Sequence, residues 1–236
     1  MNKRIAVTSL RRLYLKSGLK RKKVRQEKSM PASTRLQFTQ KCVDLLDQLT
    51  ALKQQGLPIV YLDETLFGKR SIVSREWSSK NSNLTVSQEE QCTGYRNVIA
   101  SMTEEEGILY PHLQESPCDS HDFIKYLYVL QRKMNFKPFA LFMDNAPIHT
   151  AKVVKPYYAD LEITPVFNVG YSPEFNPIEA VFSKVKRLFI HERLNNLVNK
   201  TGFNFDRTIK KSFRSINADH CGACVRKSLF LLQKAA

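Results

Sequence analysis

An α/β fold is predicted by the way strand-like and helix-like segments alternate along the chain. Two short apolar runs, residues 59–62 and 139–143, have the length and composition of buried strands. Each run is followed by an acidic residue, Asp63 in the first case and Asp144 in the second. Ligands gather at the carboxyl ends of strands in such sheets, so the two acids are expected to share one site.

The other elements follow from residue periodicity and turn signals. They are expected over residues 33–52 (amphipathic helix), 97–112 (hairpin), 121–134 (helix), 149–158 (helix), 163–167 (strand) and 177–192 (helix). Ser120 is the predicted N-cap of the helix at residues 121–134. Residues 8–25 are compatible either with the end of a helix-turn-helix or with a solvated basic arm.

Composition indicates a folded protein with a polyanionic partner. Of the 236 residues, 42% are apolar, and 37 Lys and Arg against 22 Asp and Glu give a net charge of +15. Residues 1–28 contain eleven of the basic residues and one acid, so most of the excess is local. No run approaches the roughly 18–20 apolar residues of a membrane span, and five scattered cysteines suit a reducing compartment, so a soluble intracellular protein is expected.

Each strand-end acid has a structural alternative. A desolvated carboxylate costs several kcal/mol unless it is paired, hydrogen-bonded or metal-bound, but Asp63 could simply have reached solvent. Strand alternation puts Asp63 and Glu64 on opposite faces, so only one of them can point into a given site. Asp144 precedes Asn-Ala-Pro, a sequence that also makes turns or caps a following helix.

Glu179 lies in the first turn of the helix expected from residue 177. Asn176 suits the N-cap, Pro177 the first helical position, and Glu179 falls at N3. This is also the pattern of a capping box, which requires no catalysis. The two roles can coexist, because the first turn of a helix is a rigid mount for a carboxylate.

Three carboxylates would suit a two-metal site. Mg²⁺ and Mn²⁺ take oxygen ligands, and two such ions roughly 3.5–4 Å apart stabilise both oxygens of a phosphoryl displacement. Asp63 is expected to bridge the two ions, with Asp144 and Glu179 each holding one. Water or a DNA 3′-hydroxyl would attack the phosphodiester in line, with no covalent protein intermediate.

Three sequence blocks resemble the signature blocks of mariner-superfamily transposases and their bacterial insertion-sequence relatives. The blocks are YLDET, FMDNAPIHTAK and YSPEFNPIEAVFSKVK, and 34 residues lie between Asp144 and Glu179, a spacing typical of one large branch of that superfamily. The likeness extends from about residue 8 to about residue 195. Their order and spacing together make the match specific.

The resemblance implies a ribonuclease H-like fold, with a mixed five-stranded sheet flanked by helices, the Asp63 strand at its centre and the Asp144 strand beside it. It implies cleavage of double-stranded DNA at transposon ends and strand transfer into target DNA. In the family, the positions that match Asp63, Asp144 and Glu179 bind the metals. A homodimer that bridges two DNA ends is also implied, and Trp77 matches an aromatic position after the first strand.

The expected organisation has three parts: residues 1–52 as a basic linker with a helix-turn-helix remnant and an amphipathic helix, 53–200 as the catalytic domain, and 201–236 as a basic helical tail. Full-length relatives carry paired helix-turn-helix domains before the linker. The predicted DNA-contacting residues are Lys20, Arg21, Lys22, Lys23, Arg25, Lys184, Lys186 and Arg187. The first run is also compatible with a nuclear localisation signal, and solvated charge is an alternative for both groups.

The leading hypothesis is a divalent-metal-dependent DNA endonuclease and strand transferase, located in the nucleus of a eukaryote or the nucleoid of a bacterium. One alternative is a truncated or repurposed transposase-derived protein that binds DNA without cutting it. Another is an unrelated ribonuclease H-like nuclease that acts on RNA–DNA hybrids.

Overall fold

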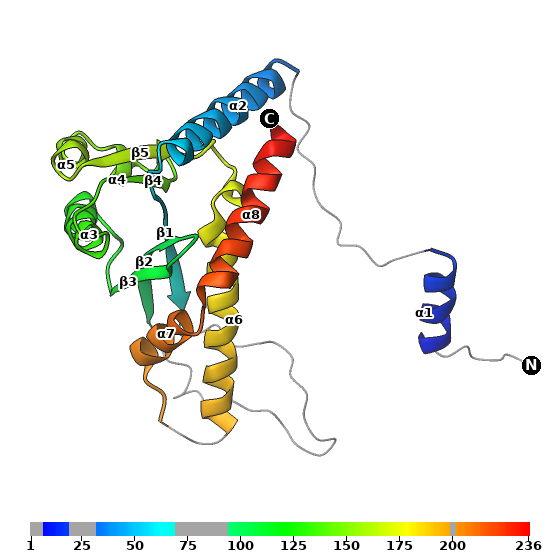
Figure 1. Ribbon diagram of the computed structural model, residues 1–236. Coiled ribbons are helices and arrows are strands. Elements are labelled where there is room, and N and C mark those ends of the chain that lie inside the picture. Colours follow the sequence, from blue (N-terminus) through cyan, green and yellow to red (C-terminus); the bar gives the residue numbers. More distant parts are fainter. Residues whose placement is uncertain (1–6, 19–31, 69–93, 199–201) are drawn as a thin grey trace, which may run out of the picture. The chain divides into compact units, whose positions relative to one another are not determined.

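The computed structural model describes residues 7–18, 32–68, 94–198 and 202–236 (Figure 1). The chain divides into two compact units, Met1–Arg35 and Leu36–Ala236. The first unit contains the helix α1 (Val7–Lys16), which overlaps the start of the segment 8–25. Within the described ranges, no helix combines the length and apolarity needed to cross a membrane.

A mixed five-stranded sheet forms the centre of the second unit. Its strand order is β3-β2-β1-β4-β5, with bounds β1 Ile59–Gly68, β2 Tyr95–Thr103, β3 Gly107–Gln114, β4 Phe139–Met143 and β5 Ile163–Phe167. β1 is antiparallel to β2 and parallel to β4, and β4 is parallel to β5. The predicted sheet is therefore confirmed, with the Asp63 strand at its centre and the Asp144 strand beside it.

Helices cover both faces of the sheet (Figure 1). One face packs against helices α2 (Ala32–Gln54), α6 (Pro177–Val198), α7 (Phe205–Arg214) and α8 (Ala218–Ala235). The other face packs against α3 (Ser120–Lys133), α4 (Pro147–Thr150) and α5 (Lys155–Asp160). Along β1, Ile59 and Tyr61 belong to the first core and Val60 and Leu62 to the second, which is the alternation expected of a strand buried on both faces.

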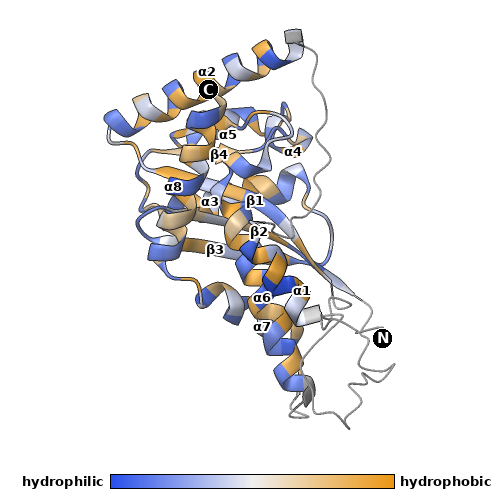
Figure 2. Ribbon diagram, turned by 90° about the vertical axis from the view of Figure 1, so that its right-hand side faces the viewer, coloured by the Kyte–Doolittle hydropathy of each residue, from blue (hydrophilic) through white to orange (hydrophobic). Residues whose placement is uncertain are grey.

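The amphipathic helix expected over 33–52 is present as α2, along which hydrophobic and hydrophilic residues alternate in Figure 2. Cys42, Leu45, Leu49 and Leu52 are buried at helical spacing. Leu36 differs from the expectation, because its side chain is 73% exposed.

β1 is longer than predicted. The sequence predicts a strand that ends in Asp63 and Glu64, but the strand continues past both acids to Gly68. The reason is a change of partner: pairing with β4 ends at Tyr61↔Phe142, whereas pairing with β2 continues to Gly68↔Tyr95. Asp63 thus lies within the strand, just past the point where β1 and β4 separate.

Two local predictions on the α3 to α5 side are wrong. Asp119, and not Ser120, caps α3, because its Oδ1 accepts from the amides of His121 and Asp122, each at 2.8 Å. The single helix expected over 149–158 is split into α4 and α5. Pro156 explains the break, since proline lacks an N–H and is tolerated only in the first turn of a helix.

The C-terminal helices α7 and α8 contribute to the same core as the sheet. Phe213 of α7 is 1% exposed, and its ring lies 6.0 Å from that of Phe67 and 6.2 Å from that of Phe182, measured between centroids. These helices therefore stabilise the face of the sheet on which Tyr61 lies.

Replacing Phe213 with Ala is expected to lower the free energy of unfolding by about 3–5 kcal/mol, because it leaves a cavity between α7 and β1. Urea unfolding followed by circular dichroism measures this. Phe230→Ala on α8 is the control, since that ring is 54% exposed and its loss is expected to cost about 1 kcal/mol or less. Equal costs for the two variants would contradict the packing described for α7.

Candidate metal centre

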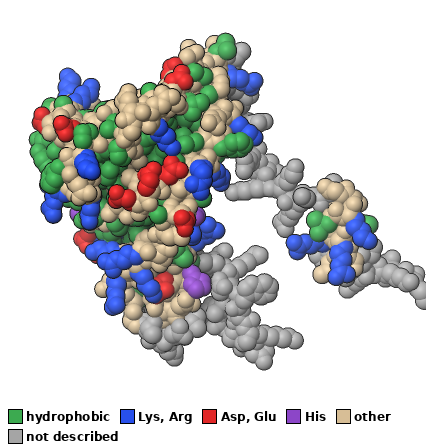
Figure 3. All heavy atoms as spheres, in the orientation of Figure 1, with side chains coloured by type: hydrophobic (Ala, Val, Ile, Leu, Met, Phe, Trp, Pro, Cys, Tyr) green, Lys and Arg blue, Asp and Glu red, His purple; other side chains and the backbone are tan. Residues whose placement is uncertain are grey.

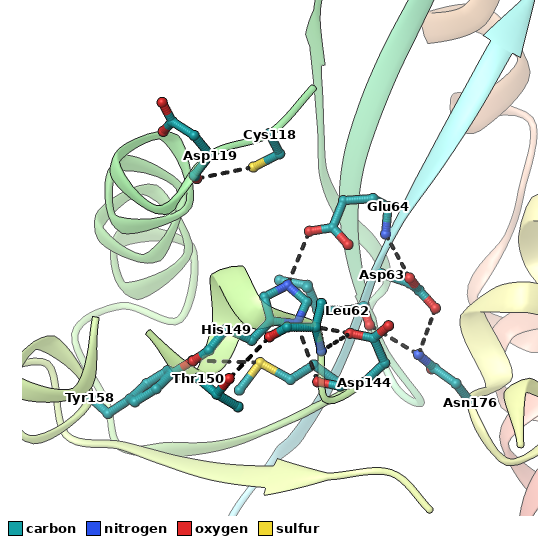
Figure 4. Close-up of polar contacts among 12 residues, drawn as sticks. Leu62, Asp63, Glu64, Cys118, Asp119, Asp144, His149, Thr150, Tyr158 and Asn176 are labelled. Atoms are coloured by element: carbon teal, nitrogen blue, oxygen red, sulfur yellow. Dashed lines mark hydrogen bonds and ion pairs between the residues drawn. The ribbon is translucent and has the colours of Figure 1, made fainter. Parts of the chain in front are cut away.

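Asp63 is held in place at both carboxylate oxygens (Figure 4). The amide of Glu64 donates to its Oδ1 at 2.8 Å, and the side-chain Nδ2 of Asn176 donates to its Oδ2 at 3.2 Å. The same Nδ2 also donates to the carbonyl of Leu62 at 3.0 Å, which ties the residue before α6 to the centre of the sheet. The solvent-exposed alternative for Asp63 is wrong, since the carboxylate is only partly accessible and is bonded within the protein.

Asp144 is the first residue after β4, and its side chain has two roles at one oxygen. Oδ1 accepts from the amide of Ala146 at 3.0 Å, which is the turn expected as the structural alternative. The same Oδ1 lies 2.9 Å from Nδ1 of His149. Within the described residues no hydrogen bond reaches Oδ2, so this oxygen is available to a ligand.

His149 is completely buried between two acids (Figure 4). Its Nδ1 faces Asp144, and its Nε2 lies 3.1 Å from Oε1 of Glu64. Burial lowers the pKa of His149, but the hydrogen bonds to Asp144 and Glu64 outweigh burial and raise the pKa to about 10. The raised pKa favours the imidazolium form at neutral pH, in which both ring nitrogens donate.

Glu64 and Asp63 point in the opposite directions expected from strand alternation. Asp63 faces Asn176 on the α6 side of the sheet, whereas Glu64 faces His149 on the α4 side. Glu64 thus does not compete with Asp63 but holds the histidine that contacts Asp144. The geometry makes His149 a partner of Asp144 and Glu64.

Glu179 lies half-buried in the first turn of α6. The capping box considered for Asn176 and Glu179 is not formed, because the side chain of Asn176 bonds to β1 and its Oδ1 has no partner in the described part of the chain. The pKa of Glu179 is raised overall, because burial and the charge of Asp144 outweigh the opposing charge of Lys186. Lys186 follows Glu179 by seven residues, and therefore two helical turns on the same face.

The three predicted acids affect one another electrostatically. The pKa of Asp63 is raised to about 7, first by burial and then by the charges of Glu179, Glu64 and Asp144, although the amide of Glu64 opposes the shift. Mutual repulsion of this kind favours a cation, and a set of carboxylate oxygens is what Mg²⁺ or Mn²⁺ prefers. Among the described residues, no three His, Cys, Asp or Glu side chains already surround a common point, so the donors fit a divalent ion in type and charge but must move closer together to bind one.

A second group of acids, residues 104–106, forms the turn between β2 and β3, where acidic side chains gather in Figure 3. Lys53 lies 3.0 Å from Glu104, and Arg226 lies 3.8 Å from it. Glu104 is therefore balanced by neighbouring cations, unlike Asp63.

The predicted basic residues are distributed in different ways. Lys186 is exposed and lies on the Glu179 face of α6, with its Nζ 6.0 Å from the ring of Phe67. Lys184 and Arg187 are instead close enough to α8 to affect His220. The pKa of His220 is lowered first by burial and then by these two positive charges. The residues Lys20, Arg21, Lys22, Lys23, Arg25 and Trp77 lie outside the described residues.

Comparison with known proteins identifies relatives of the part of the chain that contains the three acids. A family described as "DDE superfamily endonuclease" matches residues 58–198. No curated protein sequence matches the chain. Among solved structures, the Mos1 transposase paired-end complex with left transposon end is similar, with a TM-score of 0.69 at 14% identity over 97% of this chain and 69% of that one.

Two further structures are similar at comparable identity. The catalytic domain of Mos1 mariner transposase has a TM-score of 0.58 at 14% identity over 89% of this chain and 96% of that one. The Mos1 strand transfer complex has a TM-score of 0.64 at 15% identity over 97% of this chain and 68% of that one. These likenesses confirm the ribonuclease H-like fold.

Replacing His149 with Gln tests its charge through the pH dependence of stability. Because the pKa of His149 is raised from 6.5 to about 10 on folding, its stabilising contribution is complete below about pH 6.5 and is lost as the pH rises toward 10. The difference in the free energy of unfolding between wild type and His149→Gln is expected to shrink over that range.

Urea titrations of metal-free protein at several pH values measure this difference. His149 is not among the groups that shift the pKa of Asp63, so the contribution of Asp63 is expected to cancel largely between the two proteins. A difference that stayed constant from pH 6.5 to 10 would show that His149 is not charged between the two acids.

Proposed function

Because the chain belongs to the DDE superfamily endonuclease family, we propose that it is the catalytic part of a cut-and-paste DNA transposase of the mariner type. The observation that supports this most strongly is the partly buried Asp63, which is hydrogen-bonded at both carboxylate oxygens and whose pKa is raised first by burial and then by the charges of Glu179, Glu64 and Asp144. All three acids lie within the matched residues 58–198. The relatives similar in fold include structures with a transposon end and after strand transfer.

Asp63, Asp144 and Glu179 are proposed to hold two Mg²⁺ or Mn²⁺ ions, with Asp63 shared between them. When bound, such ions stabilise the attacking and leaving oxygens of a phosphodiester and lower the pKa of the attacking water. Mos1 catalytic domain structures with Mn and with Mg are among the similar folds. Loss of the proton from Asp63 would accompany cation binding, because its raised pKa reflects burial and negative neighbours.

The protein's own residues would position these ligands. Asn176 fixes Oδ2 of Asp63, and His149 fixes Oδ1 of Asp144, which leaves Oδ2 of Asp144 directed to a ligand. Glu64 holds the other side of His149. Pre-positioned side chains of this kind lower the reorganisation that a reaction requires.

The proposed substrate is double-stranded DNA. Lys186 is exposed beside Glu179 and is suited to contact a phosphate next to the reacting one, and the basic residues 20–25 would add a salt-dependent contact elsewhere. A homodimer that joins two DNA ends, in the nucleus of a eukaryotic host or in the cytoplasm or nucleoid of a bacterial one, completes the proposal.

Nicking of supercoiled plasmid in Mg²⁺ or Mn²⁺ tests the proposed activity. The wild-type chain is expected to nick, and Asp63→Asn, Asp144→Ala and Glu179→Gln are each expected to lose at least about a hundredfold in rate, because each removes a metal ligand. Asp160→Asn is the matched control, since this α5 acid is exposed and has no ion pair within the described residues.

The outcomes separate the alternatives. Binding of DNA without nicking would favour a transposase-derived protein that does not cut. Faster cleavage of an RNA–DNA hybrid than of duplex DNA would favour a ribonuclease H-like nuclease of another class. Equal nicking by wild type and Asp144→Ala would assign the activity to a contaminant.

Thermal unfolding in Mn²⁺ tests the metal site without relying on activity. At a concentration about 100 times the dissociation constant, binding to the folded state alone adds about 2.7 kcal/mol of stability, so the midpoint temperature of wild type is expected to rise. The Asp63→Asn variant is expected to show little rise, and Asp160→Asn the wild-type rise. A similar increase in all three proteins would place Mn²⁺ elsewhere.

A further inference from the structure

The loop of residues 168–176 connects the positions of two of the three acids. It begins beside Asp144, because the amide of Asn168 continues the pairing of β5 with β4 and donates to the carbonyl of Met143 at 2.8 Å. It ends at Asn176, which donates to Asp63. The loop is therefore anchored near Asp144 at its start and near Asp63 at its end.

Tyr171, in the middle of this loop, combines two unusual properties. Its side chain is fully exposed, at 107% of the reference value, and its backbone is in the left-handed region with φ of 57°. A bulky residue rarely adopts that conformation, which costs about 1–3 kcal/mol. Glycine would remove the cost, yet the adjacent Gly170 has an ordinary φ and the left-handed position holds an aromatic residue.

Hydrogen bonds keep this loop in its shape. The side chain of Asn145 donates to the carbonyl of Asn168 at 2.9 Å, and the side chain of Asn168 donates to the carbonyl of Ser172 at 2.8 Å. Asn168 Oδ1 also accepts from the amide of Val169 at 2.8 Å. Asn168 and Ser172 are buried, so the two residues that flank the exposed segment are anchored. The ring of Tyr171 is thus presented to solvent from a fixed backbone.

We propose that Tyr171 is a stacking residue for an unpaired nucleobase of the DNA bound at the carboxylate centre. This inference rests on the proposed function, since the base that the ring would bind belongs to the proposed DNA substrate. An exposed aromatic face binds any base by stacking. A base is uncharged, so it can lie close to Asp63, Asp144 and Glu179, where a phosphate without a bound cation would be repelled. Stacking would hold a nucleotide beside the phosphodiester that is cut or joined.

Phe136 provides a matched control elsewhere in the fold. It is also an exposed aromatic residue, at 70%, with a left-handed backbone and φ of 56°. It lies between α3 and β4, at the amino end of β4, whereas Tyr171 lies beyond the carboxyl ends of β4 and β5. The two positions share strain and exposure and differ in their distance along β4 from the acids.

The test compares binding of two short DNA duplexes, one fully paired and one with a single unpaired 2-aminopurine, in a chelating buffer that prevents cleavage. Wild type and Tyr171→Trp are expected to prefer the unpaired duplex and to quench 2-aminopurine fluorescence. Tyr171→Asn is expected to lose roughly five- to hundredfold in affinity for the unpaired duplex only. Asn tolerates the left-handed backbone, so this variant keeps the loop conformation.

Phe136→Asn is expected to behave as wild type. The proposal is overturned if Tyr171→Asn keeps the preference, if wild type has none, or if Phe136→Asn loses it equally. Plasmid nicking by the same preparations reports on the proposed function separately. Wild type that nicks but shows no effect of Tyr171 would leave the transposase assignment in place and reject stacking alone.

Discussion

The parallel pairing of β1 with β4 is the constraint on which the proposed site depends. The last paired residues are Tyr61 and Phe142, and each acid follows its paired residue by two positions. Adjacent strands lie about 4.8 Å apart, so Asp63 and Asp144 come close to each other just past the end of this pairing, although Asp63 remains paired with β2. The apolar residues before each acid keep this register, because a shift by one residue would turn a buried face outward. The core and the site are therefore specified by the same residues.

Burial of Asp63 makes the metal-free site electrostatically unfavourable, and the surrounding residues reduce that cost unevenly. His149 is charged and neutralises much of the field at Asp144 and Glu64, which explains why the pKa of Asp144 is lowered. Among the described residues, Asp63 has hydrogen bonds from Asn176 and the amide of Glu64 but no cationic partner, and its pKa stays raised. The negative charge that no protein cation balances therefore lies at Asp63, the acid proposed to bridge two ions. This is the pattern expected where function, and not stability, determines the residue.

The sheet and most helices were predictable because their signals are local, namely apolar runs, helical spacing and strand ends. The same signals place Asp63, Asp144 and Glu179 on their elements, and their joint role as metal ligands stays a proposal. The contacts that organise the acids were not predictable in this way. Asn176 obeys the local rule for an N-cap, yet it bonds to Asp63, 113 residues earlier, and His149 meets Glu64 across 85 residues. The capping-box interpretation fails for this reason, since tertiary contact overrides a local preference. The extension of β1 past Asp63 is likewise set by its pairing with β2, which no pattern within residues 59–68 shows.

The central claim is that Asp63, Asp144 and Glu179 form one divalent-metal site, and anomalous X-ray diffraction from crystals containing Mn²⁺ tests it most directly. Two anomalous peaks are predicted, roughly 3.5–4 Å apart, both in contact with Asp63 and one each with Asp144 and Glu179. Carboxylates that remained apart with no peak between them, or Mn²⁺ bound only at the turn of residues 104–106, would contradict the account.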